Sequence, residues 1–282
     1  MDKRVILDGI KNQEQRYLAA QVLNKMDLVR GYRNFEKTDF LDPTQQAFVR
    51  RIVKQYGLTE LNCNFFGGYK GAERKVAVFS CTCGHAVLNE EDHADAFNRN
   101  NEIITCIRIE PHINEKQNQL LNLSHRDYLG ALMGLGIERS KIGDILPEEN
   151  GVLCHIFIAV ELQDYIAYNF TNAGNYGISL AFISLNDLMI NRKTMLKESR
   201  KTVASLRLDC ILAAALNLPR GKAADFIHAG KVTVNWEICE NAARALKEED
   251  VLSVKGFGRI YICRVEGMTK KGRIAIILGT PE

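Results

Sequence analysis

The sequence predicts an α+β protein built from three parts, and three observations support this. Apolar residues at helical spacing dominate the first 60 residues and give way to two strand-like runs. The stretch 100–185 follows with the order βαββαβ, and the last third shows two short helices leading into a small β unit. A chain of 282 residues is long enough for two or three domains. We place them at 1–85, 86–188 and 189–282.

The first part, residues 1–60, is predicted to be mostly helical. One helix spans 10–26, and its expected inner face is Tyr17, Leu18, Val22 and Leu23. Asp42 followed by Pro43 is typical of an N-cap and the first helical position, so a second helix is expected from there to Gly57. Two strands are expected after it, around 61–66 and 76–81. This part is therefore an N-terminal helical/α+β unit.

The central part is predicted to be a ferredoxin-like domain, that is, the RNA-recognition-like βαββαβ arrangement. The strands are expected at 103–109, 142–146, 152–160 and 178–185, and the helices at 125–135 and 161–170. Domains of this plan that read RNA stack bases on aromatic residues of the sheet. The expected strands here are mainly aliphatic, with only Phe157 and Phe182. RNA reading by this sheet is therefore not predicted.

The final part is predicted to begin with a basic linker at 189–205 and to continue with two helices. Leu208, Ile211 and Leu212 make an apolar stripe on the first helix, which Pro219 is expected to end. The second helix should turn Ala223, Ala224 and Ile227 inward, with Gly230 at its C-terminal cap. Val232 and Val234 then alternate with polar residues, which is typical of a half-buried strand.

This last part resembles the RNA-binding domain named after small-subunit ribosomal protein four, here called the S-four-type domain. The matching residues are Arg207-Leu208-Asp209, Arg220, Lys222-Ala223, Gly230-Lys231-Val232, Val234-Asn235 and Asp250-Val251. Departures from the family pattern occur at Pro219, Trp236 and Glu249, and they concern the turns. The resemblance implies RNA binding. We expect Arg207, Arg220, Lys222 and Lys231 to pair with phosphates, with Lys201 and Arg259 as outer contacts, and we expect Asn235 of the motif to bind RNA as well.

Charge distribution supports a polyanionic partner. Residues 191–282 hold 17 Lys and Arg against 10 Asp and Glu, a net charge of +7, whereas the first 190 residues carry −4. Positive charge gathered at one end of a nearly neutral chain is typical of a phosphate-binding surface. The alternative for these residues is an ordinary solvated face. Trp236 and Phe257 are expected either to stack on unpaired bases or to cover a small core.

Motifs of catalysis and metal binding are weak. His125-Arg126-Asp127 spells the start of a kinase catalytic loop, but Leu132 stands where that loop needs asparagine. We expect instead that Ser124 and Asp127 cap a helix, that Gly130 and Gly134 allow close packing, and that Gly136 is its C-cap. Cys81, Cys83 and His85 lack the spacing of a structural zinc site. Arg207-Leu208-Asp209 also spells the catalytic motif of pseudouridine synthases, but Asp209 in a helix's first turn is stabilising without any chemistry. No enzyme activity, metal or other cofactor is expected.

Composition favours a soluble protein of the reducing cytoplasm. The N-terminus is interrupted by charges before any apolar stretch of signal length, and no run is long enough to span a membrane. Eight cysteines are scattered without the spacing of a disulfide framework.

Along nearly its full length the chain resembles the bacterial YlmH family. The residues that carry this resemblance are 40–46, 67–69, 72–75, 124–137 and 141–145. It implies an N-terminal unit, an RNA-recognition-like domain and an S-four-type domain. It also implies a non-enzymatic RNA binder linked to the large ribosomal subunit, to rescue of stalled chains carrying peptidyl-tRNA, and to cell-division genes.

The expected function is thus binding of structured RNA, which the protein recognises by its phosphates and its shape. The expected partners are ribosomal RNA of the large subunit and also tRNA. Two alternatives stay open from sequence: an RNA-modifying enzyme that uses the last domain for delivery, and a protein adaptor of the division machinery. The oligomeric state is not predicted.

Overall fold

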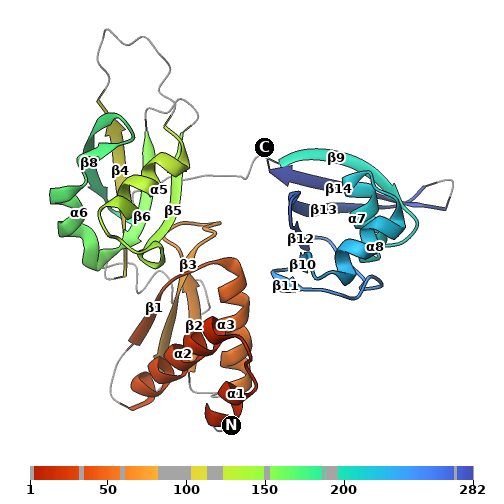
Figure 1. Ribbon diagram of the computed structural model, residues 1–282, viewed down its shortest axis with the longest axis horizontal. Coiled ribbons are helices and arrows are strands. Elements are labelled where there is room, and N and C mark those ends of the chain that lie inside the picture. Colours follow the sequence, from red (N-terminus) through yellow and green to blue (C-terminus); the bar gives the residue numbers. More distant parts are fainter. Residues whose placement is uncertain are drawn as a thin grey trace. The chain divides into compact units, whose positions relative to one another are not determined.

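The fold is that of a computed structural model, which describes residues 3–31, 35–57, 61–81, 103–112, 123–148, 153–185, 188, 196–269 and 272–281. The chain divides into two compact units, Met1–Asn191 and Arg192–Glu282, each taken by itself below. Helices and antiparallel sheets make up both units (Figure 1), as the predicted α+β class requires. The predicted boundary near residue 85 lies outside the described residues, so the division of the first unit into two domains stays a prediction.

The first unit begins with a three-stranded antiparallel sheet of order β1-β3-β2. Its elements are α1 (Lys3–Asp8), α2 (Gln13–Gly31), β1 (Phe35–Leu41), α3 (Pro43–Tyr56), β2 (Leu61–Phe66) and β3 (Lys75–Cys81). Helices α1, α2 and α3 lie on one face of this sheet (Figure 1), and their apolar side chains form a core with Phe79.

Residues 1–60 are mostly helical, as predicted, but two details differ from the expectation. Residues 35–41 form a strand that was not predicted, because β1 pairs with β3 and buries Phe40 and Leu41. The predicted inner face of α2 is wrong for Tyr17, which is 68% exposed, and confirmed for Val22 and Leu23, which are buried. The full buried face is Ala19, Val22, Leu23, Met26 and Val29. Those five positions repeat at the helical spacing of three and four residues.

The predicted caps of α3 are confirmed. The Asp42 carboxylate accepts from the Gln45 backbone N–H at 2.8 Å, and the Gln45 side chain accepts from the Asp42 N–H at 2.9 Å. This reciprocal pair is a capping box, followed by Pro43 at the first helical position. Gly57 ends the helix with a φ of +69°, which glycine adopts without strain.

The first unit continues with a five-stranded antiparallel sheet of order β5-β6-β4-β8-β7. Its elements are β4 (Ile104–Pro111), α5 (His125–Gly134), η1 (Arg139–Lys141), β5 (Ile142–Pro147), β6 (Cys154–Ala159), η2 (Val160–Leu162), α6 (Gln163–Asn169), β7 (Asn172–Ala173) and β8 (Tyr176–Ile183). The four long strands alternate with α5 and α6 as a ferredoxin-like domain requires, so this prediction is confirmed. Both helices pack on one face, over a core of mostly isoleucine side chains.

The other face of this sheet is largely closed. Phe157 is fully buried there, with its ring stacked on Tyr69 at a centroid distance of 4.9 Å. Phe40, Val76 and Val78 of the three-stranded sheet pack into the same cluster. Phe157 therefore cannot stack on a base as the aromatic residues of RNA-recognition sheets do.

Predictions for α5 are confirmed at its ends and wrong in its middle. Asp127 accepts from both the backbone N–H and the hydroxyl of Ser124, at 2.8 and 2.7 Å, which makes the expected capping box. Gly136 has a φ of +82° and caps the other end. A Cβ at Gly130 or Gly134 would meet nothing within 4 Å, so these glycines do not allow close packing.

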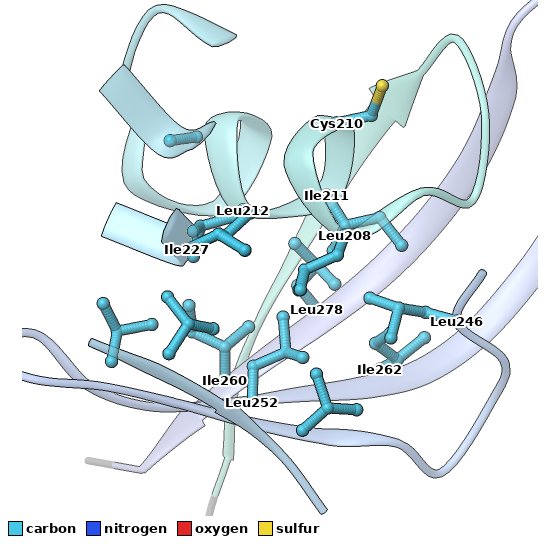
Figure 2. Packing of buried hydrophobic residues seen from close by; sticks show 14 of the residues in the cluster. Leu208, Cys210, Ile211, Leu212, Ile227, Leu246, Leu252, Ile260, Ile262 and Leu278 are labelled. Carbon is cyan, nitrogen blue, oxygen red and sulfur yellow. The ribbon is translucent and has the colours of Figure 1, made fainter. Parts of the chain in front are cut away.

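The second unit is a six-stranded antiparallel sheet of order β11-β10-β12-β13-β14-β9, with α7 and α8 on one face. Its elements are β9 (Leu196–Val203), α7 (Leu208–Leu216), α8 (Arg220–His228), β10 (Val232–Val234), β11 (Glu237–Ile238), β12 (Val251–Val254), β13 (Gly258–Met268) and β14 (Ile274–Pro281). Figure 2 shows Leu208, Ile211 and Leu212 pointing toward the sheet while Cys210 points away from it.

The predicted linker at 189–205 is wrong for 196–203, which form β9 and pair with β14 over eight residues. The segment carries few apolar residues because it lies at the sheet edge, so its sequence shows no strand pattern. Helix α7 ends at Leu216, with Asn217 left-handed at a φ of 52°, two residues before Pro219. Ala223 and Ile227 are buried as predicted, and Gly230 follows α8 at a φ of +65°.

Candidate nucleic-acid interface

Two arginines of the second unit converge on one carboxylate. Arg207 donates from Nε and Nη2 to Asp209 at 3.2 and 3.1 Å, and Arg220 donates from the same two nitrogens at 3.0 and 2.8 Å. Both guanidinium groups contact the Asp209 Oδ2 atom. The Asp209 side chain is 6% exposed, whereas those of Arg207 and Arg220 are 42% and 55% exposed. We call this arrangement the arginine clamp.

Local structure brings these three residues together. Arg207 is the N-cap residue of α7 and Asp209 lies in its first turn, where the helix dipole favours a carboxylate. Arg220 is the first residue of α8 and is returned to Asp209 by the turn after Asn217. The helix pair, rather than sequence proximity, therefore places Arg220 beside Arg207.

The two arginines of the clamp keep the Asp209 carboxylate ionised. Burial alone would raise the pKa of Asp209, but hydrogen bonds from Arg207 and Arg220 outweigh it and lower the pKa to about 2. The hydrogen bond to Asp209 raises the pKa of Arg220. A guanidinium has five N–H groups, and each arginine gives two to Asp209. Three on each remain for an anion at the surface.

Other predicted residues lie near the same helices. Lys201 on β9 donates to the Asn217 side chain at 3.0 Å, and Lys222 is exposed in the first turn of α8. The Lys231 ammonium lies 5.5 Å from the centroid of the Phe226 ring, and the Phe226 and Phe257 rings stand edge to face with their centroids 5.6 Å apart. Phe257 is 52% exposed, which favours the stacking alternative for this residue.

Asn235 is occupied inside the domain. Its amide donates to Asp250 at 2.9 Å and its carbonyl accepts from the Val251 N–H at 2.9 Å. It has a φ of 50°, so its side chain fixes a turn that few residue types adopt. Trp236 follows at a φ of 65° and is half-buried, and it is not among the described residues that pack against the core of this unit, so the choice between its two predicted roles stays a prediction. The predicted contact of Asn235 with RNA stays a prediction.

Arg259 is separated from the clamp by the sheet. It pairs with Ser253 across β12 and β13, next to Ile260, which is buried in the core under the helices. Successive residues of a strand point to opposite faces, so Arg259 lies on the face that α7 and α8 do not cover. The predicted convergence of all basic residues on one surface therefore fails for Arg259.

Two further arginines were missed in the sequence. Arg200 and Arg273 line a cavity of about 730 Å³ beside Lys201 and Arg220. Neither belongs to the matching S-four-type residues, and Arg200 falls in the segment expected to be a linker. Only the pairing of β9 with β14 brings them to the clamp.

In the first unit, the residues 67–69, 72–75 and 141–145 build an internal junction. The buried Asp144 carboxylate accepts from the Tyr69 hydroxyl at 2.8 Å and from the Glu73 and Arg74 backbone N–H groups at 2.7 and 2.9 Å. The Arg74 side chain donates to the carbonyls of Phe40, Arg139 and Ile142. These contacts hold the three-stranded sheet against the five-stranded one.

Elsewhere, Cys83 and His85 lie outside the described residues, as does the side chain of Cys81. Among the residues that the structure describes, no group of three His, Cys, Asp or Glu side chains has a metal-ligand arrangement. No helix in the described ranges is long and apolar enough to cross a membrane.

Comparisons with known proteins found matches for the ferredoxin-like domain and for the C-terminal domain. Residues 112–187 match a family model described as "Putative RNA-binding domain in YlmH", and residues 206–252 match the S4 domain. The chain is 33% identical over 263 residues to the ribosome-associated protein quality control protein P2 of Bacillus subtilis, covering 93% of each chain. A solved structure, the cell division protein ylmH from Streptococcus pneumoniae, matches 63% of this chain and 95% of its own at 21% identity and a TM-score of 0.46. On the identity and coverage of the Bacillus relative, the chain belongs to the YlmH family.

Proposed function

We propose that this protein is a non-enzymatic RNA-binding protein that holds the backbone of structured RNA with its arginine clamp. The observation that carries the proposal is that Arg207 and Arg220, both partly exposed, share the buried carboxylate of Asp209 within the matched S4 domain. Lys222 and Lys231 extend the positive surface along α8 and its C-terminal end.

The clamp suits phosphate for a geometric reason. A guanidinium forms two parallel hydrogen bonds to a phosphate, and such bonds are among the strongest in proteins. Asp209 already fixes both side chains, so less side-chain entropy is lost when RNA binds. Phosphate contacts fix position without reading sequence, so the shape of the folded RNA selects the site. Phe257 beside Lys231 offers a ring on which a base stacks.

The RNA we propose is ribosomal, on the large subunit, with tRNA as a neighbouring contact. Support comes from the Bacillus relative, whose name describes a ribosome-associated quality control protein, and from the full-length similarity to it. The same proposal places the protein in the cytoplasm. No observation on the described residues favours an RNA-modifying activity, and Asp209 is engaged in ion pairs rather than open to a substrate.

The test is binding of the full chain to large-subunit RNA fragments across a salt series. If several phosphates are neutralised, the logarithm of the affinity falls linearly with the logarithm of salt, by about 0.9 per phosphate on a duplex. Arg220→Ala and Lys222→Ala should each weaken binding to every fragment and reduce that slope by about 1. Arg259→Ala removes the same charge from the other face of the sheet and serves as the matched control.

An affinity that does not change with salt contradicts phosphate anchoring, as does an equal loss in the Arg259→Ala variant. Sedimentation of the protein with ribosomal subunits, before and after ribonuclease treatment, addresses the partner. Release on digestion supports the RNA contact. Partners that survive digestion unchanged favour the protein adaptor instead.

A further inference from the structure

A groove lies beside the arginine clamp, between the edge strand β9 and helix α7. Its volume is about 730 Å³, within the range of sites that take small molecules. Lys201, Arg220 and Arg273 provide its charged rim, and Ala213 and Ala214 provide part of an apolar wall. Arg200 also lines the groove, but strand alternation turns its side chain to the other face of the sheet. None of the described residues that line it is acidic. We call it the basic groove.

The pairing of β9 with β14 also determines which charged side chains face the groove. Lys201 pairs with Ile276, a core residue, so both point to the helix side of the sheet. Lys201 is held by the Asn217 amide oxygen, and Arg273 donates to the Thr202 carbonyl at 2.8 Å. These acceptors are uncharged, so they orient the two cations without neutralising them. Two of the arginines that line the groove pair with carboxylates outside its lining, Arg220 with Asp209 and Arg200 with Glu266.

The groove combines two surfaces with different requirements. A rim of positive charge attracts phosphate, but the apolar wall gains nothing from it. A fully paired duplex presents phosphates and riboses and keeps its bases stacked inside. An unpaired nucleotide offers both parts at once, because its phosphate meets the rim while its base covers apolar surface.

We propose that the basic groove receives one unpaired nucleotide of the RNA that the arginine clamp holds. This inference rests on the proposed function, since Arg220 belongs both to the clamp and to the rim of the groove. The nucleotide in the groove is therefore next in the strand to a phosphate on the clamp. The groove adds selection for looped or bulged RNA to the phosphate contacts, which are indifferent to base pairing.

The experiment compares two blunt RNA duplexes that differ by a single bulged 4-thiouridine, bound to the full chain and followed by fluorescence anisotropy. The wild type should bind the bulged duplex roughly tenfold more tightly, the ratio expected from stacking one base. Illumination should cross-link the 4-thiouridine to the segments 200–204 or 210–218, which line the groove.

Two variants make the test specific. Ala214→Leu fills the groove, and Arg273→Gln removes a rim charge outside the matched domain residues. Each should abolish the preference for the bulged duplex while leaving binding of the paired duplex within about twofold. Lys222→Gln, a change outside the groove, should weaken binding of both duplexes equally and keep the preference. The urea unfolding curve of Trp236 fluorescence identifies a variant that does not fold.

Equal affinity of the wild type for both duplexes, or cross-links confined to other segments, overturns the groove inference. In that case the proposed RNA contact of the arginine clamp is still supported if Arg220→Ala weakens binding of both duplexes. If the wild type binds neither duplex nor any large-subunit RNA fragment, the proposed function fails together with the groove.

Discussion

The arginine clamp predicts a measurable loss of stability when its carboxylate is neutralised. In Asp209→Asn the side chain keeps its shape but loses the charge to which Arg207 and Arg220 donate. The pKa of Asp209 is lowered from 3.8 to about 2, and this difference corresponds to about 2 kcal/mol of folding free energy at neutral pH. The carboxylate is buried but its two arginine partners are about half exposed, so solvent screening makes about 2 kcal/mol an upper value.

The assay is urea unfolding of the full chain, followed by tryptophan fluorescence. The protein has a single tryptophan, Trp236, which lies in the second unit, so the signal reports that unit alone. With a urea dependence of about 1.5 kcal/mol per M, the loss should lower the midpoint by about 1 M. Asp225→Asn is the matched control, because it makes the same charge change at an exposed position of the neighbouring helix α8.

The pH dependence gives a second, independent check. The carboxylate is more acidic in the folded protein, so its stabilisation is complete above the unfolded pKa of about 3.8 and is lost as pH falls toward 2. The difference in urea unfolding midpoint between the wild type and Asp209→Asn should therefore become smaller as the pH falls below about 5. A midpoint shift equal to that of Asp225→Asn, or a difference that persists undiminished at low pH, refutes the reasoning.

Three further outcomes are expected in the first unit, each measured by far-UV circular dichroism during thermal unfolding, with the Trp236 signal unchanged. Asp144→Asn should destabilise this unit by about 3 kcal/mol, because it removes the acceptor for Tyr69 and the backbone of residues 73 and 74. Gly68→Ala should destabilise it by more than about 2 kcal/mol, because the new Cβ would lie 2.4 Å from the Phe157 ring at a φ of +92°. Gly130→Ala should stabilise it by up to about 1 kcal/mol, because the site is open and helical. A neutral Gly68→Ala, or a destabilising Gly130→Ala, contradicts the packing derived for these glycines.

Local signals in the sequence predicted the elements that depend on local physics. The capping box at Asp42 and Gln45 and the cap at Ser124 and Asp127 are short-range hydrogen bonds, so a few neighbouring residues determine them. The order of strands and helices in the ferredoxin-like domain could also be predicted, because each element depends on a pattern within a short segment. Strand β9 was not predicted, because its pairing partners lie between 71 (Val203 to Ile274) and 85 (Leu196 to Pro281) residues later in the chain.

The roles of the candidate RNA-binding residues could be predicted only in part from the sequence. The motif match for Arg207, Arg220 and Asn235, and the positive charge of Arg259, suggested that all four contact RNA, but neither signal shows which way a side chain points. The structure uses Asn235 to close a turn against Asp250 and places Arg259 on the far face of the sheet. The same limit applies to Asp144 and Arg74, whose motifs serve to join two sheets.

By itself, the sequence determined the α+β class, the capped helices and the basic character of the C-terminal unit, because propensity, caps and charge are properties of short segments. Tertiary structure decided which of those charges share a carboxylate, which lie behind the sheet, and that β9 completes a groove beside the clamp. The physical reason is that these arrangements depend on contacts between residues far apart in the chain, which no local pattern encodes.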